Sequence, residues 1–163
     1  MSRPSLLSGL IFCFFALSCS KNESAGSVVS SPADETNPFF VESTLPYGMP
    51  HFDLIRNEHF IPAFERGMAE ELTEISAIAS NPEPASFENT IVAMEQSGQL
   101  LARAQRAFSS LTSAHTNDTL KTIQTEMAPR FSSHNDSISL NANLFARVAE
   151  LYGTRDTLSL DAR

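Results

Sequence analysis

The sequence contains no tryptophan, two tyrosines and two cysteines among its 163 residues. Cys13 lies in an apolar stretch near the amino terminus that has the features of a cleaved leader. Its removal would leave Cys19 as the one cysteine of the mature chain, so a disulfide within that chain is excluded. A catalytic cysteine is also excluded once Cys19 is given another role.

Basic residues are few as well. Lys and Arg number 11 against 19 Asp and Glu, which gives a formal net charge of −8. Binding to nucleic acid requires Lys and Arg on one face to neutralise phosphates, so no nucleic-acid partner is expected. The same balance disfavours electrostatic docking on an anionic membrane surface. Any contact with a membrane therefore has to come from another part of the chain.

The familiar catalytic motifs are missing. The six glycines are scattered and form no phosphate-binding loop, and there is no G-x-S-x-G elbow. No two histidines lie three or four residues apart, so no helix face presents two imidazoles to a metal. We predict no catalytic residue and no metal ligand in this chain, and we interpret every histidine as structural or superficial. These histidines are His51, His59, His115 and His134.

The amino terminus resembles a bacterial lipoprotein leader. Arg3 precedes an apolar run over residues 6–17 that is too short to span a bilayer comfortably. The run ends in ALSC at 16–19, which resembles the lipoprotein cleavage box, although the box usually has Leu where this sequence has its Ala. We predict cleavage between Ser18 and Cys19, lipidation of Cys19, and an extracytoplasmic chain anchored in the membrane on the periplasmic side of a bacterial envelope. An ordinary cleaved signal or an uncleaved anchor is the alternative.

The segment after the 1–18 signal peptide is expected to lack a helix. Residues 19–36 are rich in Ser, Asn, Gly, Pro and acidic residues, as in a flexible tether. Prolines 38, 46 and 50 forbid a long helix beyond it, yet the apolar side chains there need burial. We therefore expect residues 37–56 to form an extended arm laid over the domain surface. The side chains expected to be buried are Phe39, Phe40, Val41, Leu45, Tyr47 and Phe52.

Later segments repeat apolar residues with the period of an α-helix, and none shows the two-residue period of a strand. The sequence therefore predicts an all-α fold, an antiparallel helical domain over residues 57–163. In its first helix, Glu70, Glu71 and Glu74 lie off the apolar stripe and are interpreted as a solvated face. The stripe expected to face the core comprises Phe60, Phe64, Met68, Leu72, Ile75 and Ala79.

The second helix is expected over residues 86–111, with a wide buried face. Ser86 is a good N-cap, and the short connection over 81–85 should make this helix an antiparallel neighbour of the first. Gly98 lies mid-helix, where glycine costs about 1 kcal/mol against alanine, so either a neighbouring backbone comes very close or the helix bends. The seam expected to be buried comprises Phe87, Ile91, Met94, Gly98, Leu101, Gln105 and Phe108.

A third helix should follow the hydroxyl and carboxylate caps offered by residues 114–118, and Pro129 in its interior should kink it. Asn141 is the expected cap of a short fourth helix. Asp161 stands where a further helix would be capped, but no helix body follows, so we expect the polypeptide to be cut short. The inward side chains should be Leu120, Ile123, Met127, Phe131 and Ile138 in the third helix, and Leu144, Phe145, Val148 and Leu151 in the fourth.

Specific strings carry more information than this periodicity. They are NPFF at 37–40, PHFDLI at 50–55, EHFIPAFE at 58–65, FENTI at 87–91, SG at 97–98, TN at 116–117, EMAP at 126–129 and LN at 140–141. In this order and without large gaps, the chain resembles the N-terminal part of a bacterial peptidyl-dipeptidase, or dipeptidyl carboxypeptidase. These enzymes belong with thimet oligopeptidase, neurolysin and oligopeptidase A.

The resemblance implies a much longer, mainly helical zinc peptidase whose halves enclose a channel that admits only short peptides and releases C-terminal dipeptides. Its zinc would be held by an HExxH helix and a downstream Glu, with the Glu of HExxH as general base. This sequence contains no HExxH. No metal ligand or catalytic residue of the family can therefore be carried onto it. The resemblance implies a truncated N-terminal peptidase domain that binds no zinc itself and is inactive alone.

Two functions remain open from the sequence. The chain is either the lipid-anchored N-terminal segment of such a peptidase, or a free-standing helical lipoprotein that serves as a peptide-binding or scaffolding module. In both cases the only expected membrane contact is the lipid anchor. An in-frame continuation that encodes HExxH would favour the first function.

Overall fold

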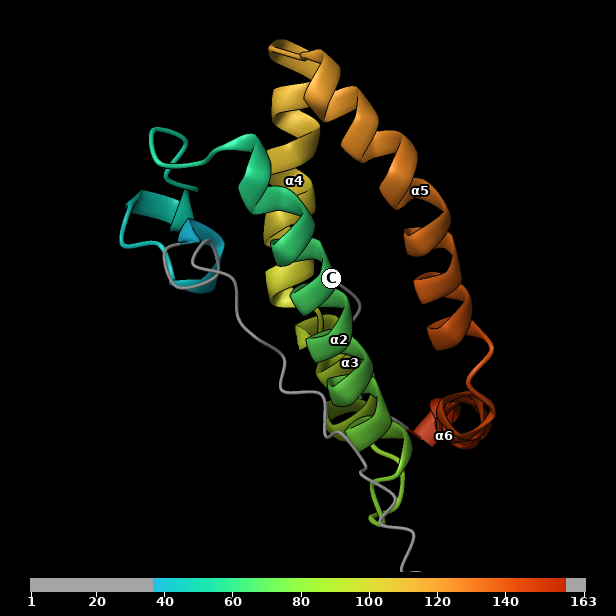
Figure 1. Cartoon of the computed structure of the whole chain (residues 1–163). Helices are drawn as coiled ribbons and strands as arrows, with labels where there is room; N and C mark the ends of the chain where they lie inside the picture. Colours follow the sequence, from blue (N-terminus) through green and yellow to red (C-terminus); the bar gives the residue numbers. More distant parts are fainter. Residues whose placement is uncertain (1–36, 158–163) are drawn as a thin grey trace, which may run out of the picture.

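The computed structural model describes residues 37–157, which contain helices, turns and loops and no β-strand (Figure 1). The predicted all-α fold is confirmed. The cleavage site at Ser18 and Cys19, the tether over 19–36 and the cap at Asp161 lie outside the described residues. The main helices are α2 (Phe60–Ala79), α3 (Ala93–Gln96), α4 (Gln99–Ala114), α5 (Asp118–Ser139) and α6 (Ala142–Gly153).

Helices α2 and α4 lie side by side and run antiparallel, as the short connection between them predicts (Figure 1). Their backbones touch where Gly67 of α2 meets Leu101 of α4. A Cβ added at Gly67 would lie 2.8 Å from both the Cα and the N of Leu101. The close backbone approach considered for Gly98 is therefore found in this helix pair, but Gly67 provides it.

The second predicted helix is interrupted. A π-helical segment, Phe87–Val92, leads into α3, and the chain then leaves the helix at Ser97 (φ −76°, ψ 162°). Gly98 follows with φ +66° and ψ 23°, a left-handed conformation that glycine adopts at little cost. The prediction of one continuous helix is wrong, because this residue ends one helix and precedes the next. Gln105, which was expected in the buried seam, is exposed on α4.

The main core is built from aromatic rings that come from distant parts of the chain. The Phe60 ring centroid lies 5.4 Å from that of Phe39 in the arm and 4.9 Å from that of Phe108 in α4. Phe64 lies 5.4 Å from Phe108 and 5.0 Å from Phe131 of α5. Aromatic pairs at these distances contribute beyond the area they bury, so the cluster holds the start of the arm and three helices together.

The helix starts are capped at the two residues that the sequence singled out, Ser86 and Asn141, and at Asn117, an amide in the string 114–118 where a hydroxyl or carboxylate was expected. Ser86, Asn117 and Asn141 each accept a hydrogen bond from a backbone N–H two or three residues later, at 2.9 to 3.1 Å. Asn89 completes a reciprocal pair by accepting from the N–H of Ser86 at 2.8 Å. These caps satisfy donors that the first helical turn leaves free.

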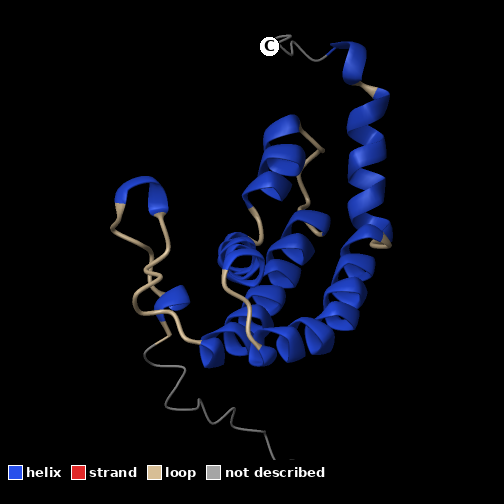
Figure 2. Cartoon of the chain, turned by 90° about the horizontal axis from the view of Figure 1, so that it is seen from above, coloured by secondary structure: helices blue, strands red, loops and turns tan. Residues whose placement is uncertain are grey.

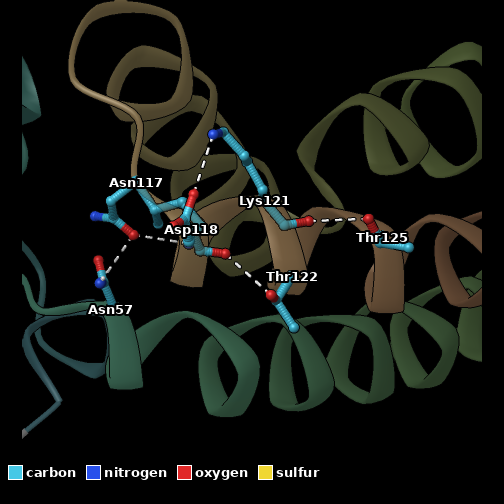
Figure 3. Close-up of polar contacts among 7 residues, drawn as sticks. Asn57, Asn117, Asp118, Lys121, Thr122 and Thr125 are labelled. Atoms are coloured by element: carbon cyan, nitrogen blue, oxygen red, sulfur yellow. Dashed lines mark hydrogen bonds and ion pairs between the residues drawn. The ribbon is translucent and has the colours of Figure 1, made fainter.

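The start of α5 is also tied to the segment before α2, as Figure 3 shows. The Nδ2 of Asn57 donates to the Oδ1 of Asn117 at 3.4 Å, and that oxygen is the α5 cap. Asp118 pairs with Lys121 at 3.1 Å, and its carbonyl accepts from the Thr122 hydroxyl at 2.9 Å. One cap residue thus links two segments that are 60 residues apart.

Helix α5 continues without interruption through Pro129 and bows along its length (Figure 1, Figure 2). Its buried face is formed by Leu120, Ile123 and Met127, with His134 about two turns further along the helix. The first three residues were expected to face inward. His134 was not singled out for burial, and it contacts the polar part of the α2 surface at Glu71.

The arm lies on one side of the helices, and α5 and α6 lie on the other (Figure 2). Phe39 is buried against Phe60, and Phe40 is half-buried beneath the guanidinium of Arg66, which lies 4.4 Å from its ring centroid. Beyond these two the arm leaves the core and forms a tight turn at Pro46–Gly48. The expected burial is therefore wrong for the four later side chains, Val41, Leu45, Tyr47 and Phe52.

Two further side chains predicted to face inward are exposed, Leu72 and Phe145. In α6 the buried positions are Leu144, Arg147 and Leu151, spaced by three and four residues as one helix face requires. Phe145 falls outside that face because the arginine occupies the inward position. In the second half of α2, Ile75 and Ile78 pack with Leu144, which turns Leu72 toward solvent.

Candidate functional site

No catalytic residue or metal ligand is predicted for this sequence. Residues 37–157 contain no group of three or more His, Cys, Asp or Glu side chains placed to hold a metal ion. Within the same range no helix has the length and apolar character needed to cross a bilayer. The predicted lipidation residue Cys19 and its neighbour Ser18 fall outside it. The candidate site has to be sought among the polar clusters and hollows of the helical body.

One polar contact joins α2 to α5. The Nε2 of His134 lies 2.8 Å from the Oε2 of Glu71, and the two side chains are only 2% and 20% exposed. A carboxylate oxygen only accepts hydrogen bonds, so the imidazole donates. The Nδ1 of His134 is buried and has no partner among the described residues. The interpretation of Glu71 as part of a solvated face is wrong, because its side chain is largely buried against His134. The sequence did not reveal this contact, because the two residues are 63 positions apart.

A second carboxylate on α2 holds the break between α3 and α4. The Oε2 of Glu74 accepts a hydrogen bond from the backbone N–H of Gly98 at 2.8 Å. The carboxylate of Glu71 lies beside the same residue, where an added Cβ would come within 2.5 Å of its Cδ. Both carboxylates therefore face the start of α4, where negative charge is favoured by the helix dipole. These side chains shape the helix junction and do not offer a metal site.

The third polar feature is a buried arginine, whose burial the sequence pattern did not predict. Arg147 of α6 is 8% exposed. Its Nη1 donates to the carbonyls of Asn81 and Glu83 at 2.8 and 3.0 Å. Its Nη2 donates to the Oδ1 of Asn89 at 2.8 Å and to the Thr90 hydroxyl at 3.4 Å. The one available signal was its position on the apolar face of a short helix.

A hollow of about 430 Å³ lies between the arm and α4, and we call it the arm groove. It differs from the polar clusters because its lining combines apolar side chains with basic ones. The lining residues with a bearing on binding are Glu42, Tyr47, Met49 and Phe52 of the arm, and Arg103 and Arg106 of α4.

The arm side of the groove is shaped by a strained turn. Tyr47 has φ +61°, a left-handed conformation that costs a non-glycine residue about 1 to 2 kcal/mol. The turn is closed by a hydrogen bond from the N–H of Gly48 to the carbonyl of Leu45 at 3.1 Å, and by the Ser43 hydroxyl, which donates to the carbonyl of Met49. As a result the tyrosine ring projects fully into solvent at the edge of the groove.

The α4 side of the groove is basic. The Nη2 of Arg103 donates to the carbonyl of Phe39 at 2.6 Å, which fixes this guanidinium between α4 and the arm. The guanidinium of Arg106, one turn later, makes no hydrogen bond or ion pair within residues 37–157. A free guanidinium in a hollow suits a planar anion such as a carboxylate, because it can donate two parallel hydrogen bonds.

Comparison with known proteins gives two close relatives. The chain is 48% identical over 126 residues to the dipeptidyl carboxypeptidase of Escherichia coli and 41% identical over 126 residues to that of Salmonella typhimurium. Over these 126 residues the chain is similar to the dipeptidyl carboxypeptidases. The matched segment is 77% of this chain but only 18% of each relative, so the chain spans less than a fifth of the dipeptidyl carboxypeptidases it matches. No family model matches the chain.

The relationship inferred from the sequence strings is thereby confirmed. The described residues form a helical body that is held by polar contacts between helices, and the arm groove is the hollow of mixed apolar and basic lining on its surface. None of the described residues forms a donor set that fits zinc. The arm groove remains the candidate site for binding.

Proposed function

We propose that this chain forms the N-terminal helical part of a zinc-dependent peptidyl-dipeptidase that releases dipeptides from the C-termini of short peptides. The observation that carries the proposal is the 48% identity over 126 residues to the E. coli dipeptidyl carboxypeptidase. The all-helical structure and the order of the matching sequence strings also support it.

In this proposal the chain contributes structure and the chemistry resides elsewhere. The helices would form one wall of a channel that restricts substrate size. Zinc and the residues of an HExxH motif would be supplied by another part of the enzyme, where a metal-bound water is the usual nucleophile for peptide hydrolysis. The 163-residue sequence has no HExxH, so we expect the chain to be inactive by itself.

An activity assay tests the proposal directly. The purified 163-residue chain is titrated with zinc and incubated with a peptide of three or more residues, and release of dipeptides is measured. We expect no hydrolysis from the chain alone. We expect activity when the chain is added to an E. coli dipeptidyl carboxypeptidase from which the matching segment has been deleted. Zinc-dependent hydrolysis by the isolated chain would contradict the proposal that the catalytic residues lie in another part of the enzyme.

We further propose that Cys19 carries a lipid anchor that holds the chain on the extracytoplasmic side of a bacterial membrane. The support is the leader-like sequence that ends in ALSC at 16–19. Cys19→Ser should release the protein from the membrane fraction after cell lysis. Cys13→Ser is the matched control, because that cysteine would be removed with the leader. Membrane partitioning that is unchanged in Cys19→Ser would rule out lipidation.

A further inference from the structure

The arm groove gathers apolar side chains that have no cover in the described structure. Tyr47, Met49 and Phe52 are 104%, 51% and 39% exposed, and all three line the groove. Single exposed apolar residues are common on protein surfaces, but several gathered in one hollow are typical of a binding site. The conformation of Tyr47 also supports a binding site. Its strained backbone holds the ring in solvent, where the ring stabilises nothing in the described fold, and such strain is typical of functional sites.

The charge in the groove is opposite to that of the whole chain. The chain has a formal net charge of −8, yet the ionisable residues that line the groove with a formal charge are Arg103, Arg106 and Glu42. The guanidinium of Arg106 has no polar partner in the part of the chain that the structure describes. The buried Nε of Arg103 likewise has none within residues 37–157. The groove therefore attracts an anionic group while most of the acidic surface repels one.

The shape of the groove favours a peptide over a membrane. The hollow has walls on both sides, formed by the arm and by α4, and its 430 Å³ can accept a few side chains of an extended segment. A lipid surface would be flat, and anionic lipids would be repelled by the net charge of the chain.

We propose that the arm groove binds an extended peptide that carries carboxylates next to apolar side chains. The guanidinium of Arg106 receives a carboxylate, and Arg103 beside it adds positive charge. Met49 and Phe52 receive the apolar side chains, and Tyr47 covers them from the edge. This binding surface does not depend on the proposed peptidase activity, since it requires neither zinc nor a catalytic residue.

A fluorescence anisotropy titration of the full 163-residue chain tests the proposal. The probe is a fluorescein-labelled peptide amide of sequence Gly-Leu-Phe-Glu-Asp. Two comparison peptides have Gln and Asn in place of the acids, or Ala in place of Leu and Phe. We expect saturable binding of the first peptide, and binding of both comparison peptides that is weaker by roughly tenfold.

Variants then locate the binding. Arg106→Gln should weaken binding of the acidic peptide by roughly tenfold and leave the helical circular dichroism signal and the melting temperature unchanged. Lys121→Gln is the matched control, because it removes one positive charge from an exposed position that does not line the groove. Tyr47→Asn separates binding from structure. Asn tolerates the left-handed conformation, so stability should be equal or higher while binding weakens.

Several outcomes would overturn the proposal. These are no binding of the acidic peptide, equal binding of the neutral peptide, or equal effects of Arg106→Gln and Lys121→Gln. Binding of the chain to vesicles of phosphatidylglycerol that is lost in Arg106→Gln would assign the groove to a membrane surface instead. Concentration-dependent dimerisation in analytical ultracentrifugation that is lost in the same variant would assign it to a second copy of the chain.

Discussion

The imidazole of His134 in α5 and the carboxylate of Glu71 in α2 meet at 2.8 Å in a largely buried part of the helix interface. A carboxylate that accepts from a buried donor is worth more than a surface ion pair, because removing it leaves the donor unsatisfied. This contact lies beside the break between α3 and α4, since an added Cβ at Gly98 would lie 2.5 Å from the Cδ of Glu71. The Glu71 side chain therefore lies where α2, α5 and the start of α4 meet.

Loss of the Glu71 carboxylate should destabilise the fold. Glu71→Ala is expected to lower the free energy of unfolding by about 2 kcal/mol, since it strands the buried Nε2 of His134. The adjacent Glu70→Ala is the matched control. Glu70 pairs with Arg66 at 2.7 Å, but both side chains are about half exposed, so the loss should stay below about 1 kcal/mol. Urea denaturation followed by circular dichroism measures both values, and equal losses would contradict the special role of Glu71.

Gly98→Ala should destabilise the chain through two separable effects. The left-handed backbone at φ +66° costs alanine about 1 to 2 kcal/mol, and the new methyl group displaces the Glu71 carboxylate. In a Glu71→Ala background the second effect is absent. A double-mutant cycle should therefore show less-than-additive losses, with a coupling of about 1 kcal/mol. Strict additivity in urea denaturation would mean that the methyl group and the carboxylate do not compete for space.

The sequence reveals the helices and their caps more readily than the contacts between helices. The caps at Ser86, Asn117 and Asn141 are local, because each side chain bonds a backbone N–H within three residues. Ser86 and Asn141 were predicted, and Asn117 lies in the string 114–118 for which a hydroxyl or carboxylate cap was expected. A bend at Gly98 was one of two alternatives, but the full break was not predicted, because apolar periodicity continues across residues 97–98 in the same register. Arg147 was missed because its partners lie 57 to 66 residues away, and sequence spacing carries no signal for such contacts.

The side chains of the arm were also hard to place from the sequence, because several that were expected to be buried are exposed at the arm groove. Apolar residues in a proline-rich arm were expected to be covered, because exposure of several large side chains is unfavourable in an isolated domain. Of the arm side chains that were expected to be buried, only Phe39 and Phe40 lie in or beside the aromatic core, which Ile55 also joins at the end of the arm. The side chains around the left-handed turn at Tyr47 are exposed, and the sequence of this turn, Pro-Tyr-Gly, does not specify a positive φ at a tyrosine.

Gly67 should tolerate no side chain. In Gly67→Ala the added Cβ would lie 2.8 Å from backbone atoms of Leu101, so α2 and α4 would have to separate. We expect a loss of about 2 to 3 kcal/mol in the free energy of unfolding. Gly153→Ala is the matched control, because no atom lies within 4 Å of a Cβ at that position. Its stability should be unchanged or slightly higher, and a comparable loss in both variants would contradict close contact at Gly67.

Arg147 should be needed to dock α6. Arg147→Met keeps much of the side-chain volume but leaves four acceptors without their donor, and we expect a loss of about 3 kcal/mol. Arg155→Met removes an exposed arginine beyond α6 and should cost little. Hydrogen exchange offers a sharper readout than a melt. In Arg147→Met the amides of α6 should lose protection while those of α4 keep it, whereas uniform loss would mean that the arginine supports the whole fold.

Asn117 combines a helix cap with a long-range contact, so its substitution should show both effects. Asn117→Ala removes the acceptor for the N–H of Leu120 and for the Nδ2 of Asn57, and should cost about 1 to 2 kcal/mol. Asn57→Ala leaves the cap in place and loses only the contact of 3.4 Å, so its cost should be at most about 0.5 kcal/mol. Asn117→Asp should recover most of the loss, because a carboxylate also caps a helix start and interacts favourably with its dipole. Thermal denaturation of the three variants measures this order. Equal losses in Asn57→Ala and Asn117→Ala would show that the contact between the two asparagines, and not the cap, holds the start of α5.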